Sequence, residues 1–360
     1  MTNKLKDIII TITIPVFLIT LMFINILKKD ALISTSERRQ LATKPTPSIT
    51  SILDGSFMTS FDKYTTDQFY QRNALRMLKA NIDLTFQNNY HNLYIYEDYI
   101  IEALYPLNIS SINSLSKKIT NIKNTYLNSS NHIYFSIIPD KNYFVNDNNL
   151  KLDYITLIDM MKNNLSYAKY IDITSCLSLN DYYKTDPHWR EENLIKVAQT
   201  LANSMNTTID TDYNITSITQ FDGTYSARIP KNIGYDTIKI LTNETISSST
   251  VYNYQNNSTT SIYDLSKISS LDKYDIYLSG SVPLITITNN NNTINKELII
   301  FRDSFTSSLA PLLLSGYSKI TLIDTRYISP KILTNYIDFS NKDILFIYST
   351  LLINDSVSIK

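Results

Sequence analysis

Glycine is scarce in this sequence, and its scarcity excludes two kinds of nucleotide-binding loop. Only five of the 360 residues are glycine, and none of them lies within ten residues of another. P-loops and dinucleotide-binding loops need several glycines within a few residues, because the backbone itself must approach the phosphates. We therefore expect no bound nucleotide, and the sequence indicates no other cofactor. The glycines are Gly55, Gly223, Gly234, Gly280 and Gly316.

Cysteine and histidine are also scarce, which argues against a disulfide framework and a metal centre. The single cysteine, Cys176, excludes an intrachain disulfide and a thiolate metal cluster. Its surroundings, "ITSCLSL", are typical of a small buried side chain rather than a nucleophile. The three histidines, His91, His132 and His188, are scattered along the chain and predict no histidine-rich zinc site. We expect no metal.

The chain has no excess of charge of either sign. It carries 33 basic and 33 acidic side chains, so its formal net charge is zero and no basic field favours nucleic acid as a partner. Hydrophobic residues make up 43% of the sequence and charged residues 18%, which is typical of a globular rather than a disordered chain. The length fits one large domain, or one domain with appendages.

One long hydrophobic run is present near the N-terminus. Ile8–Leu27 contains 20 residues without a charge, and at about 1.5 Å per residue it would span a bilayer core of about 30 Å. Lysines flank the run on both sides, so the flanking charges alone do not fix its orientation. A cleaved signal peptide is the alternative, but the run is long for one and no A-x-A cleavage site follows closely. We expect residues 1–29 to be an uncleaved anchor, with the bulk of the chain extracytoplasmic.

The rest of the chain divides into a linker and one domain. Residues 30–50 are polar and contain two prolines, which favours a linker next to the membrane. The expected domain covers residues 51–360, and it begins with helical spacing from about Thr59 to Phe86. Residues 207–296 are rich in Thr, Ser and Asn with β-branched runs, which predicts an antiparallel excursion.

Outside this excursion, short apolar runs alternate with helical patterns. This alternation predicts an α/β fold with a mostly parallel sheet and helices on both faces. The runs expected as strands are "HIYFSII", "AKYIDIT", "ELIIF", "SKITLI" and "DILFIYS". The segments expected as helices include "TSSLAPLLLSG", with Gly316 as its C-cap, and "PKILTNYIDF".

Two turns carry side chains suited to nucleophilic catalysis. Chemistry in such sheets lies beyond the carboxyl ends of the strands, where "FRDSF" follows an apolar run and "TDPHW" stands between a strand and a helix. A serine hydroxyl needs a base within hydrogen-bond reach, and the base needs a group that holds its tautomer. Ser304, His188 and Asp186 supply one of each.

The local spacing permits this arrangement without requiring it. Asp186 and His188 lie two positions apart, so in extended backbone their side chains point to the same side. Pro187 stiffens the position between them, and Trp189 is placed to shield the imidazole from water. The alternative is structural, because Asp-Ser after a strand and Asp-x-His before a helix are both ordinary helix-cap signatures.

The motifs resemble a known family. "DYYKTDPHWREENL", "IIFRDSFTSSLAPLL" and "ITLIDTRYI" resemble the signature, the serine block and the following segment of the DHHW family of Gram-positive bacteria. That family is related to the SGNH-type acetyltransferases that modify alginate and bacterial cellulose. "ERRQLATKP" and "FDKYTTDQFYQR" are similar to its N-terminal approach to the domain. The resemblance runs from about residue 37 to the end.

This resemblance implies an SGNH-hydrolase-like fold and an acyl-transfer function. It implies Ser304 as nucleophile, His188 as base and Asp186 as the acid that orients it. The implied process is O-acetylation of a cell-surface polysaccharide, with a multi-pass membrane O-acyltransferase passing the acetyl group across the bilayer. The residues expected to line the pocket are Trp189, Arg302, Asp303, Arg326 and Tyr327.

The sequence departs from the pattern at two positions and leaves two other functions open. Pro187 stands in place of the family's first histidine, and Arg302 stands where SGNH enzymes usually have glycine. The N–H of Ser304, near a helix N-terminus, is a candidate oxyanion donor. No separate donor asparagine is assigned, and Asn354 is a weak candidate. An acetylesterase would use the same triad with water as acceptor. A non-catalytic glycan-binding or assembly subunit would keep the fold alone.

Overall fold

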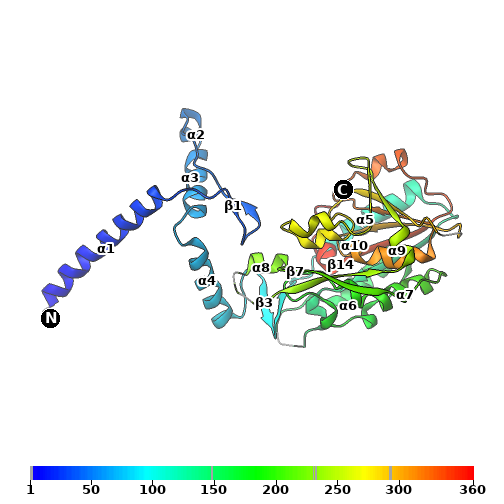
Figure 1. The fold of residues 1–360 in the computed structure, drawn as a ribbon. Helices are drawn as coiled ribbons and strands as arrows, with labels where there is room; N and C mark the ends of the chain where they lie inside the picture. The colour runs from blue at the N-terminus through cyan, green and yellow to red at the C-terminus, as the bar shows by residue number, and fades with distance from the viewer. Residues whose placement is uncertain (1–2, 147–148, 230, 232, 292–293) are drawn as a thin grey trace. The chain divides into compact units, whose positions relative to one another are not determined.

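The computed structural model describes residues 3–146, 149–229, 231, 233–291 and 294–360. The chain forms two compact units (Figure 1). The first unit comprises Met1–Tyr90 with Ser226–Asn232, and the second comprises His91–Tyr225 with Ile233–Lys360. The domain limits expected from the sequence, at residues 29 and 50, stay a prediction.

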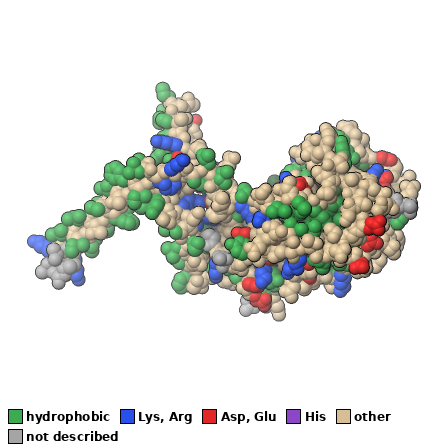
Figure 2. All heavy atoms as spheres, viewed as in Figure 1, with side chains coloured by type: hydrophobic (Ala, Val, Ile, Leu, Met, Phe, Trp, Pro, Cys, Tyr) green, Lys and Arg blue, Asp and Glu red, His purple; other side chains and the backbone are tan. Residues whose placement is uncertain are grey.

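The first unit opens with one long apolar helix, α1 (Asn3–Leu27). Its stretch Lys6–Leu27 has a mean hydropathy of 2.4 and is long enough to cross a membrane, and a signal sequence has the same properties. Figure 2 shows hydrophobic side chains facing outward along this helix. Asn25 donates from its side chain to the Leu21 carbonyl, so this polar group is satisfied within the helix. The expected N-terminal apolar helix is confirmed, and its role as an anchor stays a prediction.

The segment after α1 is bonded to the helices that follow. It forms a short antiparallel pair, β1 (Ile33–Ser34) and β2 (Arg39–Gln40). The Arg39 guanidinium binds both carboxylate oxygens of Asp67, at 2.8 and 2.5 Å, and the Ala42 N–H donates to the same carboxylate at 2.9 Å. Hydrogen bonding from Arg39 lowers the pKa of Asp67 to about 2, against the effect of burial.

Three helices complete the first unit: α2 (Ile49–Leu53), α3 (Ser56–Asp67) and α4 (Arg72–Gln87). The helical spacing expected over 59–86 is therefore interrupted between Asp67 and Arg72. Gln71 has a φ of 59°, in the left-handed region, which an α-helix cannot accommodate.

An eight-stranded sheet forms the centre of the second unit. Five neighbouring strands run parallel, and three antiparallel strands extend one edge. The predicted strands are confirmed, although "AKYIDIT" contributes only two residues to the sheet. In spatial order the strands are β10 (Ser258–Thr260), β9 (Thr250–Asn253), β11 (Leu284–Thr288), β13 (Lys319–Ile323), β12 (Glu297–Arg302), β14 (Asp343–Ser349), β5 (His132–Ile138) and β6 (Lys169–Tyr170).

Helices cover both faces of this sheet, as expected. Alternate residues of β12 face opposite cores: Leu298 and Ile300 belong to one hydrophobic cluster, and Ile299 and Phe301 to the other. The first cluster is covered by α7 (Ile195–Ser204), α10 (Thr306–Leu309) and the 3-10 helix η7 (Ala310–Gly316). The second is covered by α5 (Ile109–Tyr126), α6 (Tyr154–Asn164) and α11 (Thr350–Asn354).

Two helices expected from the sequence are 3-10 helices instead. "TSSLAPLLLSG" forms the short α10 followed by η7, and "PKILTNYIDF" forms η8 (Pro330–Asn335). Each of these 3-10 helices has proline in its first turn, where the missing N–H is tolerated. Gly316 was expected to cap a helix, but it lies inside η7 and Tyr317 is the cap.

The antiparallel excursion at residues 207–296 is confirmed. It contributes β9, β10 and β11 to the sheet edge, and it also contains a separate antiparallel pair, β7 (Asn214–Phe221) and β8 (Asp236–Thr242). A further hairpin joins β3 (Leu93–Tyr96) to β4 (Tyr99–Glu102). Short helices in the connections are η1 (Lys141–Phe144), η2 (Thr174–Cys176), η3 (Leu179–Asp181), η4 (Glu191–Asn193), α8 (Thr224–Arg228), α9 (Glu244–Ser248), η5 (Leu265–Ser269) and η6 (Lys273–Ile276).

Candidate active site

The turn after β12 presents Ser304 at the carboxyl edge of the parallel strands. Asp303 fixes this turn, because its carboxylate accepts the Phe305 N–H at 3.1 Å and the Ser349 N–H, at the end of β14, at 2.7 Å. Asp303 is buried, whereas Ser304 is partly exposed. The hydroxyl of Ser304 makes no helix-cap hydrogen bond, because α10 begins at Thr306 with Phe305 at its cap position. Ser304 is therefore not the cap residue of α10, whereas the Asp303 side chain does bind the backbone that leads into this helix.

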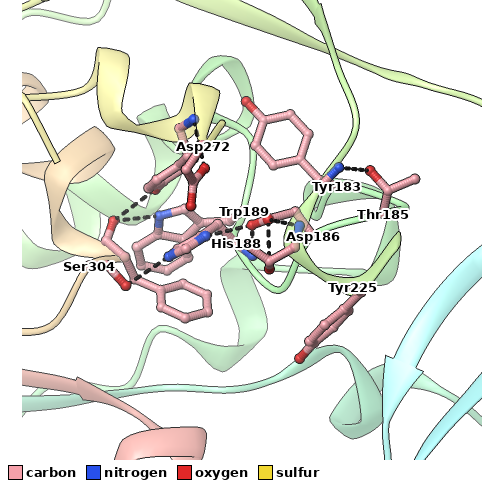
Figure 3. A network of polar contacts seen from close by, with 12 residues as sticks. Tyr183, Thr185, Asp186, His188, Trp189, Tyr225, Asp272 and Ser304 are labelled. Atoms are coloured by element: carbon pink, nitrogen blue, oxygen red, sulfur yellow. Dashed lines mark hydrogen bonds and ion pairs between the residues drawn. The ribbon is translucent and has the colours of Figure 1, made fainter. Parts of the chain in front are cut away.

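The loop that carries Asp186 and His188 closes on itself. Tyr182 and Trp189 pair as an isolated antiparallel bridge, and the Tyr183 N–H donates to the His188 carbonyl at 3.0 Å. The loop lies between η3 and η4, so both ends are held by short helical turns. This closed loop directs the side chains of Asp186 and His188 toward the turn after β12 (Figure 3).

Asp186, His188 and Ser304 form one hydrogen-bonded chain (Figure 3). The Asp186 carboxylate lies 2.5 Å from His188 Nδ1, and His188 Nε2 lies 2.8 Å from Ser304 Oγ. These contacts assign the proton of the neutral ring to Nδ1, which donates to the carboxylate, and leave Nε2 to accept the serine proton. The geometry is that of a nucleophile, its base and the acid that orients the base.

Asp186 is fully buried, and hydrogen bonds surround its carboxylate. One oxygen accepts the His188 N–H at 3.1 Å, and the other accepts the Thr224 N–H at 2.8 Å and the Thr224 hydroxyl at 3.0 Å. Burial raises the pKa of Asp186, but the charge and hydrogen bonds of His188 and the Thr224 N–H outweigh burial and lower it to about 2. The carboxylate is therefore ionised at any physiological pH.

Two aromatic rings enclose the imidazole. The ring of Tyr274, on η6, stacks on His188 with centroids 3.9 Å apart and planes 11° apart, and the Phe305 ring lies at 4.7 Å. Trp189 packs its ring edge-on against Phe305 and donates from Nε1 to the Phe305 carbonyl at 2.9 Å. Trp189 therefore shields the site through Phe305. The sequence offered no signal for Tyr274, which is one of 27 tyrosines.

Among the other expected pocket residues, Arg302 faces the protein interior. It is fully buried, and its guanidinium donates to Ser307 Oγ at 2.7 Å and to the Val282 carbonyl at 3.4 Å. Burial lowers the pKa of Arg302. Arg302 and the buried Asp303 thus hold the turn that carries Ser304 from the side of the protein interior. A contact of either residue with substrate stays a prediction.

The remaining candidates lie on other turns. Arg326 follows β13 and binds Asp324 through two hydrogen bonds, at 2.9 and 2.6 Å, while Tyr327 beside it is 48% exposed. Their place in a substrate pocket stays a prediction. Asn354, in α11, accepts the Asn108 N–H at 2.7 Å and donates to the Pro106 carbonyl at 3.1 Å, so its amide is already engaged.

Two residues that sequence reasoning did not single out hold the loop behind Asp186. Asp236, at the start of β8, accepts the Lys184 N–H at 2.9 Å, and the N–H and hydroxyl of Thr185 at 2.8 and 2.6 Å. Lys141, the first residue of η1, lies three positions after the end of β5 and donates to the Tyr183 carbonyl at 3.0 Å. The position of Lys141 at the end of an apolar strand was the one available signal.

No group of three or more His, Cys, Asp or Glu side chains that could hold a metal ion occurs among the residues that the structure describes.

The fold matches solved structures of low sequence identity. A DHHW family protein from Eubacterium siraeum superposes with a TM-score of 0.61 at 20% identity, over 74% of this chain and 92% of that chain. The chain has the fold of a DHHW family protein. Bacillus cereus PatB1, in a structure with a sulfonyl adduct, gives a TM-score of 0.56 at 17% identity, over 72% of this chain and 95% of that chain. No protein-family model matches the chain, and no curated protein matches its sequence.

The similarity to the DHHW family protein and to PatB1 agrees with the expected α/β fold, in which helices cover a mostly parallel sheet. Because both proteins share 20% or less of their sequence with this chain, the similarity establishes the fold, and the activity has to be argued from the site.

Proposed function

We propose that this protein is a membrane-anchored, extracytoplasmic serine acyltransferase that O-acetylates a cell-surface polysaccharide. The observation that carries the proposal is the continuous hydrogen-bonded chain from Asp186 through His188 to Ser304. A buried carboxylate, an imidazole and a partly exposed hydroxyl in this order are what acyl transfer through serine requires.

The reaction would proceed in two steps. In the first, Ser304 Oγ attacks the carbonyl carbon of the acetyl donor while His188 Nε2 accepts the hydroxyl proton. The tetrahedral intermediate expels the donor's leaving group, which takes that proton from His188, and the acetyl group remains on Ser304. In the second, a sugar hydroxyl attacks the acetyl-serine and loses its proton to His188, which returns it to Ser304 Oγ.

Asp186 would support both steps without changing its own protonation. Its carboxylate holds the Nδ1–H of His188 and stabilises the imidazolium that forms in each step. The stacked Tyr274 and the nearby Phe305 limit rotation of the ring and reduce its contact with water. The ring therefore stays aimed at Ser304.

The membrane helix and the polysaccharide complete the proposal. If α1 anchors the chain with its C-terminal end on the outer side of the membrane, the second unit works outside the cell, where acetyl-CoA is not supplied. A multi-pass membrane O-acyltransferase would then deliver the acetyl group to Ser304, as the resemblance of the motifs implies. An acetylesterase would share every step except the acceptor, which would be water.

The acceptor is identified by measuring how the acetyl group divides between water, as acetate, and glycan. Full-length protein in detergent is treated with 4-nitrophenyl acetate, with and without candidate cell-surface glycans, and acetate and acetylated glycan are both quantified. A transferase should move acetyl to glycan at the expense of acetate, and Ser304→Ala should abolish both products. Release of acetate alone, unchanged by any glycan of the producing cell, would support an esterase and contradict the transferase.

A further inference from the structure

A buried lysine lies directly behind the proposed catalytic acid. Lys141 follows β5 at the carboxyl edge of the sheet and is only 2% exposed. Its ammonium donates to the carbonyls of Tyr183 and Lys184, at 3.0 and 3.3 Å. Those two residues immediately precede Thr185 and Asp186, so Lys141 is hydrogen-bonded to the backbone just before the proposed catalytic acid.

Asp236 holds the same backbone through its N–H groups instead of its carbonyls. It accepts the N–H groups of Lys184 and Thr185, whereas Lys141 binds carbonyls of the same stretch. The segment is therefore clamped between one buried cation and one buried anion. A third contact comes from Gly223, whose N–H donates to the Thr185 hydroxyl at 2.8 Å.

The charge of Lys141 is compensated by the groups around it. Burial lowers the pKa of Lys141 to about 7, and the surrounding carboxylates oppose this shift. The ammonium also lies 4.9 Å from the centre of the Tyr225 ring, within range of a cation–π interaction. The carboxylates that act on Lys141, from the strongest to the weakest, are Asp186, Asp236, Asp140 and Glu102.

We propose that Lys141 is a positioning residue for the triad: together with Asp236 it fixes the Tyr183–Asp186 segment so that the Asp186 carboxylate meets His188 Nδ1. This inference rests on the proposed function, because a positioning role has meaning only if Ser304 reacts. It adds to that function a residue that touches neither substrate nor the reacting atoms.

The inference predicts a distinctive dependence on pH. The ammonium is the stronger donor, and since its pKa is lowered to about 7, it is present below that pH and is lost as pH rises through it. The rate of Ser304 acylation should therefore decline above neutrality. A guanidinium keeps its charge, so Lys141→Arg should remove this decline.

The test measures the rate of Ser304 acylation by 4-nitrophenyl acetate from pH 5 to 9, using full-length protein in detergent. Lys141→Met should lower the maximal rate by about 10- to 100-fold with little change in half-saturation, because the triad is misplaced rather than the substrate unbound. Lys141→Arg should recover part of this loss and keep its rate at alkaline pH. The control is Lys169→Met, because Lys169 also donates to a carbonyl, that of Ser204, but is exposed on β6.

The outcomes separate the two proposals. If wild-type Ser304 is not acylated, the proposed function fails, and the positioning role fails with it. If wild-type protein is acylated and a folded Lys141→Met variant matches its rate and pH profile, only the role of Lys141 is overturned. If Lys141→Met does not fold, Asp236→Asn is tested in its place. A several-fold loss of the acylation rate supports the proposal that Lys141 and Asp236 together fix the Tyr183–Asp186 segment. An unchanged rate and pH profile rejects it.

Discussion

Asp186 is the residue on which the proposed chemistry depends most. Its carboxylate accepts four hydrogen bonds, two from His188 and two from Thr224, and its pKa of about 2 keeps it ionised. Asp186→Asn keeps the size but replaces one acceptor by an amide donor, which favours the wrong tautomer of His188. We expect the acylation rate to fall about a thousandfold. The variant should also be less stable, because its amide group faces either the Thr224 N–H or the His188 N–H as a second donor.

The measurement is the burst of 4-nitrophenolate on mixing, with thermal unfolding as the control for folding. An Asp186→Asn variant that retains more than about a tenth of the wild-type burst rate would contradict the role of Asp186, since loss of the correct tautomer costs far more in enzymes of this type.

Gly223 is needed at its position because backbone approaches it closely. A Cβ added there would lie 2.3 Å from the Thr185 carbonyl oxygen and 2.5 Å from the Asp186 Cβ, closer than real atoms can approach. Gly223→Ala must therefore displace the loop that carries the acid. We expect the free energy of unfolding to fall by about 1–3 kcal/mol and the acylation rate to fall with it.

Chemical denaturation of Gly223→Ala checks this effect, with Gly234→Ala as the comparison. No atom lies within 4 Å of a Cβ added at Gly234, so any loss there reflects only its φ of +97°. If Gly223→Ala reacts at the wild-type rate, the contact does not control the position of Asp186.

At the scale of elements, the strands of the sheet could be predicted from the sequence and several helices could not. Buried parallel strands are continuous apolar runs, and four such runs, β5, β12, β13 and β14, occur in the expected places. The fifth parallel strand, β6, is a two-residue edge strand that is not buried. The break between α3 and α4 was missed because Gln71 adopts a left-handed conformation that its residue type does not indicate. The 3-10 helices η7 and η8 were missed because helical spacing alone does not distinguish them from α-helices.

Local sequence patterns also determine which residues of the site could be predicted. Ser304, His188 and Asp186 belong to compact motifs, so each could be proposed from its neighbours. Tyr274 and Asp236 reach the site from the antiparallel excursion, far along the chain from the elements they contact. Their contacts arise only from tertiary packing, and no local pattern marks them. The excursion therefore supplies part of the site in addition to extending the sheet.

The connection between β2 and α3 leads to a prediction for the segment that was expected to be a linker. Asp67 binds Arg39 and the Ala42 N–H, so Asp67→Asn should release residues 30–50. We expect faster tryptic cleavage after Arg39 at neutral pH, measured by mass spectrometry. Asp62→Asn is the control, because Asp62 is exposed on the same helix.

The pKa of Asp67 gives this contact a pH dependence. Because the pKa is lowered to about 2, the contact stabilises the fold fully above the unfolded pKa of about 3.9 and loses its effect as pH falls through 2. The segment should therefore resist pepsin at pH 4 and be cut at pH 2. Equal cleavage at both values, after correction for pepsin activity, would show that Asp67 does not hold it.

At the scale of the whole molecule, a membrane-anchored protein must keep α1 in its mature chain. We expect the protein to remain in the membrane fraction after a carbonate wash, and its N-terminal peptide to be recovered intact from that fraction. Deletion of residues 1–29 should release the protein. A mature chain that begins after residue 29 would show that α1 is a signal sequence, because α1 satisfies the criteria for both.

The central claim is that Ser304 is a nucleophile activated by His188 and Asp186, and direct identification of the modified residue tests it. Full-length protein is treated with 4-nitrophenyl acetate, quenched in acid, digested, and its peptides are sequenced by mass spectrometry. We expect acetyl on Ser304 in the wild type, and none at this position in Ser304→Ala or His188→Ala. Acetyl on Ser304 at equal rates in wild type and a folded His188→Ala variant, or none on Ser304 in folded wild-type protein, would contradict it.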